Sequence, residues 1–317
     1  MSSVPAIEVR DLVKVYSRRS ESAIRAVDGL SFAVARGSIF GLLGPNGAGK
    51  STTLRILTTQ IRPTAGTAQV AGYDVVSQPL EVRRRIAVVI QEQAADLLLS
   101  ARDNLAGFAR FHGLAPTEIH AKIDGVLRDF DLFDQAGRKV QDMSGGFRRR
   151  VQVAKIFMVD TPIVFLDEFS TGMDPILKRS VMAALRAEAA RGRTIVLTTQ
   201  ILSEAEELCD DILIVNRGRE VARGDLNALK LLSSGVYEVS LTFDSLPVGL
   251  EDELARLHPL RLSVSRSTVE IALKESERRV LELVSELSTR GRILRVEVGG
   301  ASLEDVFVEL TAKGAPQ

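Results

Sequence analysis

The segment formed by residues 44–51 is the feature that most constrains the fold. It reads Gly-Pro-Asn-Gly-Ala-Gly-Lys-Ser and follows an apolar run, Ile39–Leu43, that predicts a strand. A helix is expected to begin near Lys50. Glycine lets the backbone wrap closely around a phosphate, and the backbone amides at a helix N-terminus give a positive potential. The segment therefore predicts a phosphate-binding loop between a strand and a helix.

The residue types of this loop match the groups of a nucleoside triphosphate. We expect Lys50 to reach the β- and γ-phosphates, Ser51 to ligate Mg²⁺ and Thr52 to support the α-phosphate side. The alternative is a glycine-rich turn with a chance lysine, and the strand–turn–helix setting disfavours it. The loop residues expected to bind the nucleotide are Gly44, Pro45, Asn46, Gly47, Ala48, Gly49 and Lys50.

A second motif is the apolar strand expected at residues 163–166, which runs into Asp167 and Glu168. A carboxylate at the end of a buried strand can hold Mg²⁺ through water, as we expect for Asp167. Glu168 can then polarise the attacking water. Strands often end in solvated acids, so the motif gains its specificity from the phosphate loop upstream.

A third motif, Met143-Ser144-Gly145-Gly146-Phe147, comes just before a helix expected at residues 147–158. A serine hydroxyl and glycine amides at a helix N-terminus form another anion site, although the same residues could be a simple N-cap. The motif resembles the signature of ABC ATPases, whose usual form is Leu-Ser-Gly-Gly-Gln. Its position between the phosphate loop and the acidic strand favours that resemblance, which covers the first three-quarters of the chain.

The resemblance implies an α/β fold of the P-loop NTPase class: an ABC cassette with a RecA-like core, an antiparallel β subdomain and a helical subdomain at about residues 92–150. Tyr16 resembles the aromatic residue that stacks on adenine, and Gln91 resembles the Q-loop residue that touches Mg²⁺, water and the permease. Residues 170–174 resemble the D-loop at the dimer interface, and Gln200 occupies the switch-histidine position.

The family pattern implies ATP and Mg²⁺ as cofactors, with each ATP held between two ATPase domains. The residues it implies for catalysis are Lys50, Gln91, Glu168 and Gln200; those for the metal are Ser51, Gln91 and Asp167; and those that bind ATP across the interface are Ser144, Gly145, Gly146 and Asp174.

The sequence departs from the family pattern at Met143, Phe147 and Gln200. Glutamine can donate a hydrogen bond to the γ-phosphate but cannot hold a positive charge, so we expect hydrolysis without a histidine titration. The Thr-Thr-Gln pattern at residues 198–200, a C-terminal appendage and the ending Ser-Leu-Glu-Asp-Val-Phe at residues 302–307 resemble the daunorubicin-resistance type of exporter ATPase.

A domain boundary is expected near residues 231–235, which separates an ATPase domain at residues 1–232 from an accessory domain at residues 235–317. The second segment shows the order β, α, β, β, α, β, typical of a ferredoxin-like α+β unit. A last helix is expected over residues 303–310, with Ser302 and Asp305 as an approximate capping pair.

The amino-acid composition limits the kinds of partner and metal site that we expect for this chain. Lysine plus arginine total 41, as do aspartate plus glutamate, so the formal net charge is zero and nucleic acid is not expected. A single cysteine, Cys209, excludes an intramolecular disulfide and a cysteine-cluster metal site, and three scattered histidines disfavour a zinc site. No signal-like start or membrane-spanning run is recognised. Residues 148–150, three arginines, are expected to form a solvated helix face.

The resemblance implies a peripheral protein at the cytoplasmic face of the membrane, working with a multi-spanning permease as a homodimer or paralogous heterodimer. Two alternatives stay open. A soluble ABC ATPase acting on nucleic acid or ribosomes is disfavoured by the single cassette and the absence of a basic excess. A nucleotide-gated regulatory module with little turnover is disfavoured by Glu168 and kept open by Gln200. The sequence does not name the transported substrate.

Overall fold

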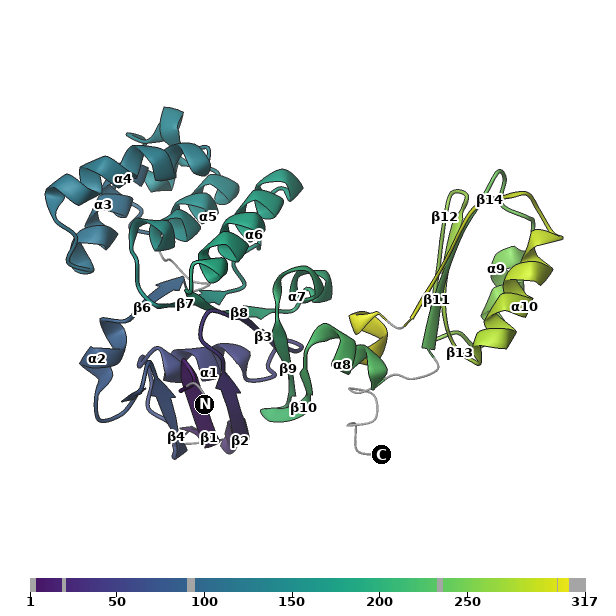
Figure 1. Cartoon of the computed structure of the whole chain (residues 1–317), viewed down its shortest axis with the longest axis horizontal. Coiled ribbons are helices and arrows are strands. Elements are labelled where there is room, and N and C mark those ends of the chain that lie inside the picture. Colours follow the sequence, from purple (N-terminus) through teal and green to yellow (C-terminus); the bar gives the residue numbers. More distant parts are fainter. Residues whose placement is uncertain (1–3, 19–20, 90–94, 233–235, 301, 308–317) are drawn as a thin grey trace. The chain divides into compact units, whose positions relative to one another are not determined.

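The computed structural model describes residues 4–18, 21–89, 95–232, 236–300 and 302–307. The chain divides into two compact units, Met1–Glu220 and Val221–Gln317, each described here by itself (Figure 1). Within the described part of the chain, no helix is long and apolar enough to cross a membrane.

A six-stranded sheet forms the centre of the first unit, with the strand order β10-β9-β3-β8-β7-β6, and its edge strand β10 runs across the boundary at Glu220. The pairs β9–β3, β3–β8, β8–β7 and β7–β6 are parallel. The strands are β3 (Ile39–Leu43), β6 (Ile86–Val89), β7 (Ile163–Asp167), β8 (Thr194–Thr199), β9 (Asp211–Asn216) and β10 (Arg219–Gly224). Strands β3, β7 and β8 are buried along their whole length, as is usual for parallel strands covered on both faces. Because parallel strands end at the same edge, the segments that follow these three strands meet there.

A second sheet of the first unit is antiparallel where its pairings are described, with the order β2-β1-β4-β5. Its strands are β1 (Ile7–Arg18), β2 (Glu21–Val34), β4 (Ala65–Val70) and β5 (Tyr73–Asp74). It shares one core with the central sheet, in which the rings of Phe32 and Phe40 stack with centroids 5.3 Å apart. The helices around these sheets are α1 (Lys50–Leu57), α2 (Pro79–Arg83), α6 (Pro175–Ala190) and α7 (Leu202–Leu208).

The helical segment predicted at about residues 92–150 runs on to residue 158. It consists of α3 (Ala101–Phe111), α4 (Pro116–Asp129) and α5 (Gly145–Ala154), with short 3₁₀ turns at Phe133–Gln135, Val140–Asp142 and Lys155–Met158 (Figure 1). The helix expected over residues 147–158 begins two residues earlier, because Ser144 is its N-cap. After Ala154 it tightens into a 3₁₀ turn.

The second unit contains α8 (Leu226–Leu231), β11 (Val236–Phe243), α9 (Leu250–Ala255), β12 (Arg261–Ser265), β13 (Thr268–Lys274), α10 (Glu277–Ser288) and β14 (Ile293–Gly300). The sheet order is β12-β13-β11-β14 and its described pairings are antiparallel, which fits the ferredoxin-like unit expected from the sequence. The final helix is described from residue 303 to residue 307, and the rest of its expected range lies outside the described residues. Asp305 N donates to Ser302 Oγ at 3.2 Å and Ser302 N donates to Asp305 Oδ2 at 3.0 Å, the capping pair that was expected.

Lys155 gives this fold a testable pH dependence. Burial lowers the pKa of Lys155 from 10.5 to about 8, although the negative charge of Asp96 opposes the shift. Between these two pH values the unfolded chain binds a proton that the folded chain lacks, so stability should rise with pH in that window. We expect Lys155→Met to raise the free energy of unfolding at pH 7 by about 2–3 kcal/mol and to remove the rise. Urea denaturation at pH 7 and pH 9.5 measures both; equal pH dependence in the two proteins would contradict the assignment.

Candidate functional site

The loop that joins β3 to α1 packs closely against two other parts of the first unit. Gly49 has a φ of 106°, in the left-handed region that favours glycine. A side chain there would approach the carbonyl oxygen of Ala26 to 2.3 Å, and one at Gly44 would approach that of Val215 to 2.2 Å. Residues 45–47 are exposed. Glycine is therefore required at both ends of the loop, and its tip is open to a ligand.

Lys50, the first residue of α1, is buried, with 4% of its surface exposed. Its Nζ donates to the carbonyl oxygens of Gly44 at 2.7 Å and Pro45 at 3.1 Å. Burial lowers the pKa of Lys50, and the negative charges of Glu168 and Asp167 act in the opposite direction. The ammonium group therefore lies within electrostatic reach of both carboxylates at the end of β7.

Asp167, the last residue of β7, receives two hydroxyl groups on one oxygen. Ser51 Oγ in α1 donates to Asp167 Oδ1 at 3.2 Å, and Thr198 Oγ1 on the neighbouring strand β8 donates to the same atom. The next residue of α1, Thr52, is half-buried. The phosphate loop and the acidic strand end thus meet at the carboxyl edge of the central sheet.

Glu168 follows in a strained backbone conformation. Its φ of 46° lies in the left-handed region that residues other than glycine seldom adopt. The backbone N of Glu168 donates to Thr198, at 3.1 Å to the carbonyl oxygen and at 3.3 Å to Oγ1. Strain of this kind persists where surrounding contacts hold it, and it gathers at functional sites.

The signature-like segment lies at the N-terminus of α5. The backbone N of Phe147 donates to Ser144 Oγ at 3.5 Å, which makes Ser144 the N-cap. Asp174 caps α6 in the same way by accepting from Leu177 N at 2.9 Å, and its other oxygen pairs with Arg150 of α5 at 2.9 Å. The signature-like helix and the D-loop-like segment are therefore joined by an ion pair.

The remaining expected site residues differ in their placement. Tyr16 on β1 pairs with Ile24 of β2. Ile24 is two residues away from Ala26, whose carbonyl oxygen the phosphate loop approaches. The side chain of Tyr16 is 38% exposed. Gln200 directly follows β8 and is exposed. Gln91 lies outside the described residues.

Comparison with known proteins places the chain in a family. Residues 27–171 match the family model described as ABC transporter. The chain is 38% identical over 314 residues to the daunorubicin/doxorubicin resistance ATP-binding protein of Streptomyces peucetius, a match that covers 98% of this chain and 93% of that protein. The chain belongs to the ABC transporter ATP-binding protein family. It is therefore an ATP-binding, ATP-hydrolysing subunit of an ABC transporter.

Further relatives of this ABC ATPase, and solved structures to which it is similar, agree with the expected fold. The Nod factor export ATP-binding protein I of Ralstonia nicotianae is 37% identical, over 99% of this chain and 96% of that protein. The structure of an ATP-binding subunit of an ABC transporter matches with a TM-score of 0.66 at 28% identity, covering 72% of this chain and 92% of that one. A dimeric cassette bound to ADP and phosphate gives a TM-score of 0.64 at 23% identity, covering 69% and 98%. The predicted ABC cassette is confirmed.

The expectation of a solvated face at residues 148–150 is wrong for Arg149, which is 6% exposed. Its guanidinium donates to the carbonyl oxygens of Asp167 at 2.8 Å, Glu168 at 2.6 Å and Phe169 at 2.9 Å. Burial lowers the pKa of Arg149, and the charges of Asp167 and Glu168 oppose the shift. The middle arginine of the run therefore braces the backbone that carries both carboxylates.

Glu204 on α7 is a further candidate that the sequence did not single out. It is 1% exposed, accepts from Thr199 Oγ1 at 2.9 Å and from Ser170 Oγ, and pairs with Lys178 Nζ at 2.7 Å. Its carboxylate thus joins the residue before Gln200 to the D-loop-like segment. The sequence signal is weak, because α7 carries several acidic residues and the groups facing Glu204 come from other segments.

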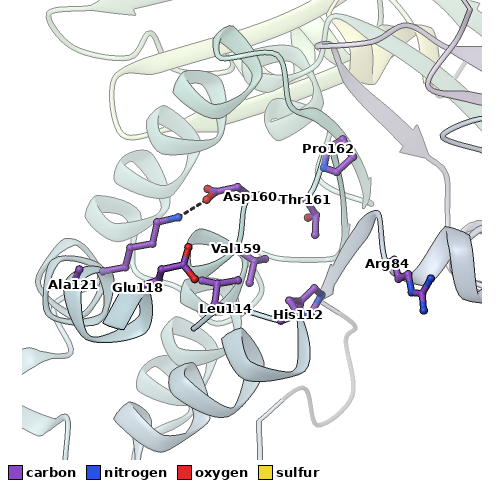
Figure 2. A pocket seen from close by; sticks show the side chains of 11 residues that line it. Arg84, His112, Leu114, Glu118, Ala121, Val159, Asp160, Thr161 and Pro162 are labelled. Carbon is purple, nitrogen blue, oxygen red and sulfur yellow. Dashed lines mark hydrogen bonds and ion pairs between the residues drawn. The ribbon is translucent and has the colours of Figure 1, made fainter. Parts of the chain in front are cut away.

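The first unit has a cavity of about 530 Å³ whose lining includes none of the expected nucleotide-site residues (Figure 2). Lys122 and Asp160 at this cavity form an ion pair with an N–O distance of 2.5 Å, and Figure 2 draws a dashed line that ends at Asp160. His112 faces two carbonyl oxygens, Phe108 O from Nδ1 at 3.0 Å and Ile86 O from Nε2 at 3.2 Å. This histidine therefore ties the end of α3 to the first residue of β6. The lining residues are Arg84, His112, Gly113, Leu114, Glu118, Ala121, Lys122, Val159, Asp160, Thr161 and Pro162.

We expect Arg149→Lys to lower the free energy of unfolding by about 2–3 kcal/mol, because one ammonium group cannot supply the fork of donors that three carbonyl oxygens receive. ATP turnover should fall as well, since the backbone of Glu168 loses its brace. Arg148→Lys is the control in the same helix. Arg148 is half-buried and donates to the carbonyl oxygens of Met143 and Gln141, not to those of residues 167–169, so its change should lower turnover less than Arg149→Lys does. Urea denaturation and phosphate release measure the two effects. Equal losses in both variants would show that Arg149 has no special part.

Proposed function

We propose that the phosphate loop binds ATP and that hydrolysis, in a composite site between two ATPase domains, drives a membrane permease. The main support is the convergence of Lys50, Ser51, Asp167 and Glu168 at one edge of the central sheet. A glycine loop, a cation, a hydroxyl and two carboxylates in this arrangement suit a nucleoside triphosphate with its metal ion.

The oxygen ligands present fit Mg²⁺. Ser51 Oγ and Asp167 Oδ1 lie 3.2 Å apart, and this hard cation prefers hydroxyl and carboxylate oxygens. We assign Ser51 and Asp167 to the ion, together with Gln91 from outside the described residues. When bound, the ion would neutralise charge on the phosphates and orient them.

The protein's own groups supply the rest of the proposed chemistry. Lys50 stabilises the charge on the β- and γ-phosphates, Glu168 orients and deprotonates the attacking water, and Gln200 donates a hydrogen bond to the γ-phosphate. Tyr16 stacks on adenine, for which its exposed ring on β1 is available. The proposed nucleotide contacts are Gly44, Pro45, Asn46, Gly47, Ala48, Gly49, Lys50, Ser51 and Thr52, with Ser144, Gly145, Gly146 and Asp174 acting across the interface from a second copy.

The names of the relatives support export as the direction of transport. They include drug-resistance and Nod factor export ATP-binding proteins, so we propose a hydrophobic compound such as a drug or lipid as the cargo. The partner is a multi-spanning permease, and the chain works peripherally at the cytoplasmic face as a homodimer or paralogous heterodimer. We place the boundary between the ATPase domain (1–232) and the accessory domain (235–317) after α8, since β10 belongs to the central sheet.

Glu168→Gln tests this function directly. The amide keeps the shape of the side chain but cannot take a proton from water, so turnover should fall by about a hundredfold or more. Mg-ATP should then hold the two ATPase domains of the variant together, detected by chemical cross-linking between these domains. Wild-type protein with ADP serves as the control and should show no cross-link between the ATPase domains, whatever the oligomeric state of the full chain. Unchanged turnover in the variant would overturn the role of Glu168.

Substitutions of Gln200 distinguish an enzyme that hydrolyses ATP in repeated cycles from a nucleotide-gated module with little turnover. We expect Gln200→Ala to lower turnover by about tenfold or more, because it removes a donor to the γ-phosphate. Gln200→His should restore activity and add a pH dependence near the ordinary histidine pKa of about 6.5, which the wild type lacks. Rates measured from pH 5.5 to 8.5 check both. ATP binding with no phosphate release from wild type, even with its permease, would favour the module.

A further inference from the structure

The last strand of the second unit, β14, is a long apolar edge. Among the described strands it pairs with β11 alone. Its Leu294, Val296 and Val298 are 57%, 46% and 43% exposed. The register places Val296 opposite Leu241 and Val298 opposite Val239, both of which are buried. The two valines therefore project to the helix-covered face of the sheet, yet neither is covered.

The other edge of the same sheet is built differently. Strand β12 has five residues against eight in β14. Its exposed side chains are serines, and Arg261 forms ion pairs with Glu238 and Glu304. Short, polar and charged edges prevent strand association, whereas long apolar edges favour it. The β14 edge is the longer of the two, and it carries the exposed apolar side chains.

The sequence of β14 is complementary to itself. Arg295 and Glu297 are exposed and form an ion pair two residues apart on one face. If two β14 strands pair in antiparallel fashion about Val296, each Arg295 lies opposite Glu297 of the other strand. Leu294 lies at a register shift of β14 and is left out of this pairing. A register centred on Glu297 would oppose two carboxylates, and a shift of one residue would set valine against a charged residue.

We propose that β14 pairs with β14 of a second copy of this chain, which joins two four-stranded sheets into one and covers the exposed valines. The contact is isologous, as a two-fold axis through Val296 requires. It makes no use of nucleotide, so it holds two subunits together in every state of the ATPase cycle. It stands or falls independently of the ATP-dependent dimer proposed above.

Charge reversal tests the register. The full chain is studied by sedimentation without nucleotide or Mg²⁺. We expect wild type to be a dimer, and Arg295→Glu or Glu297→Arg alone to weaken the dimer by about tenfold or more, because each change acts twice across the two-fold axis. The double variant Arg295→Glu/Glu297→Arg restores opposite charges and should return to within about threefold of wild type. Arg256→Glu, a matched change at an exposed position of the same unit, should have no effect.

A cross-link tests the geometry. Val296→Cys places two thiols opposite each other on the axis, within the range of a disulfide, whereas Ser263→Cys on the β12 edge does not. The native Cys209 is buried and burial raises its pKa, so it should not compete. We expect oxidation to give a covalent dimer only for Val296→Cys. A monomeric wild type, a failure of the double variant to recover, or cross-linking at both edges would each overturn the proposal.

Discussion

Three consecutive carbonyl oxygens, which begin at the last residue of β7, accept hydrogen bonds from Arg149, and the geometry of the nucleotide site depends on this contact. The chain leaves the sheet here, so these buried acceptors need another donor, and each one left unpaired would cost about 1–3 kcal/mol. The turn that results offers Asp167 to Ser51 and holds Glu168 at positive φ. Because Arg149 belongs to α5, the helix that begins with the signature-like residues is coupled to the proposed catalytic carboxylates.

Two neighbouring threonines of β8 connect the same carboxylates to the segment before Gln200 and to the D-loop-like segment. Thr198 bonds to the side chain of Asp167 and to the backbone of Glu168. Thr199 bonds to Glu204, which also accepts from Ser170 in the D-loop-like segment. A buried network with its polar atoms paired has one favoured geometry, so a displacement at one end is felt at the other. We therefore expect the segment before Gln200 and the D-loop-like segment to move together.

The sequence predicted what depends on neighbours along the chain. The phosphate loop, the buried strands and the helix that follows Ser144 each follow from residues within one short segment. It did not predict the role of Arg149, whose three acceptors lie 18 to 20 residues further along the chain. Three adjacent arginines look alike in a sequence, and the packing of α5 decides which of them is buried. The role of Glu204 was not predicted for the same reason, because one of its hydrogen-bond donors, Ser170, is 34 residues away in the chain.

The same limit applies to β14 in the accessory unit. Its alternating apolar residues predict a strand with one buried face, and the structure has the strand but leaves that face open at Val296 and Val298. The alternation of apolar and polar residues predicts which face of a strand is apolar, but it does not predict what covers that face. In this unit, helices α9 and α10 cover β11 and β13 instead of β14. An apolar face that its own domain leaves uncovered is best explained by a partner, and the opposite charges of Arg295 and Glu297 favour an identical one.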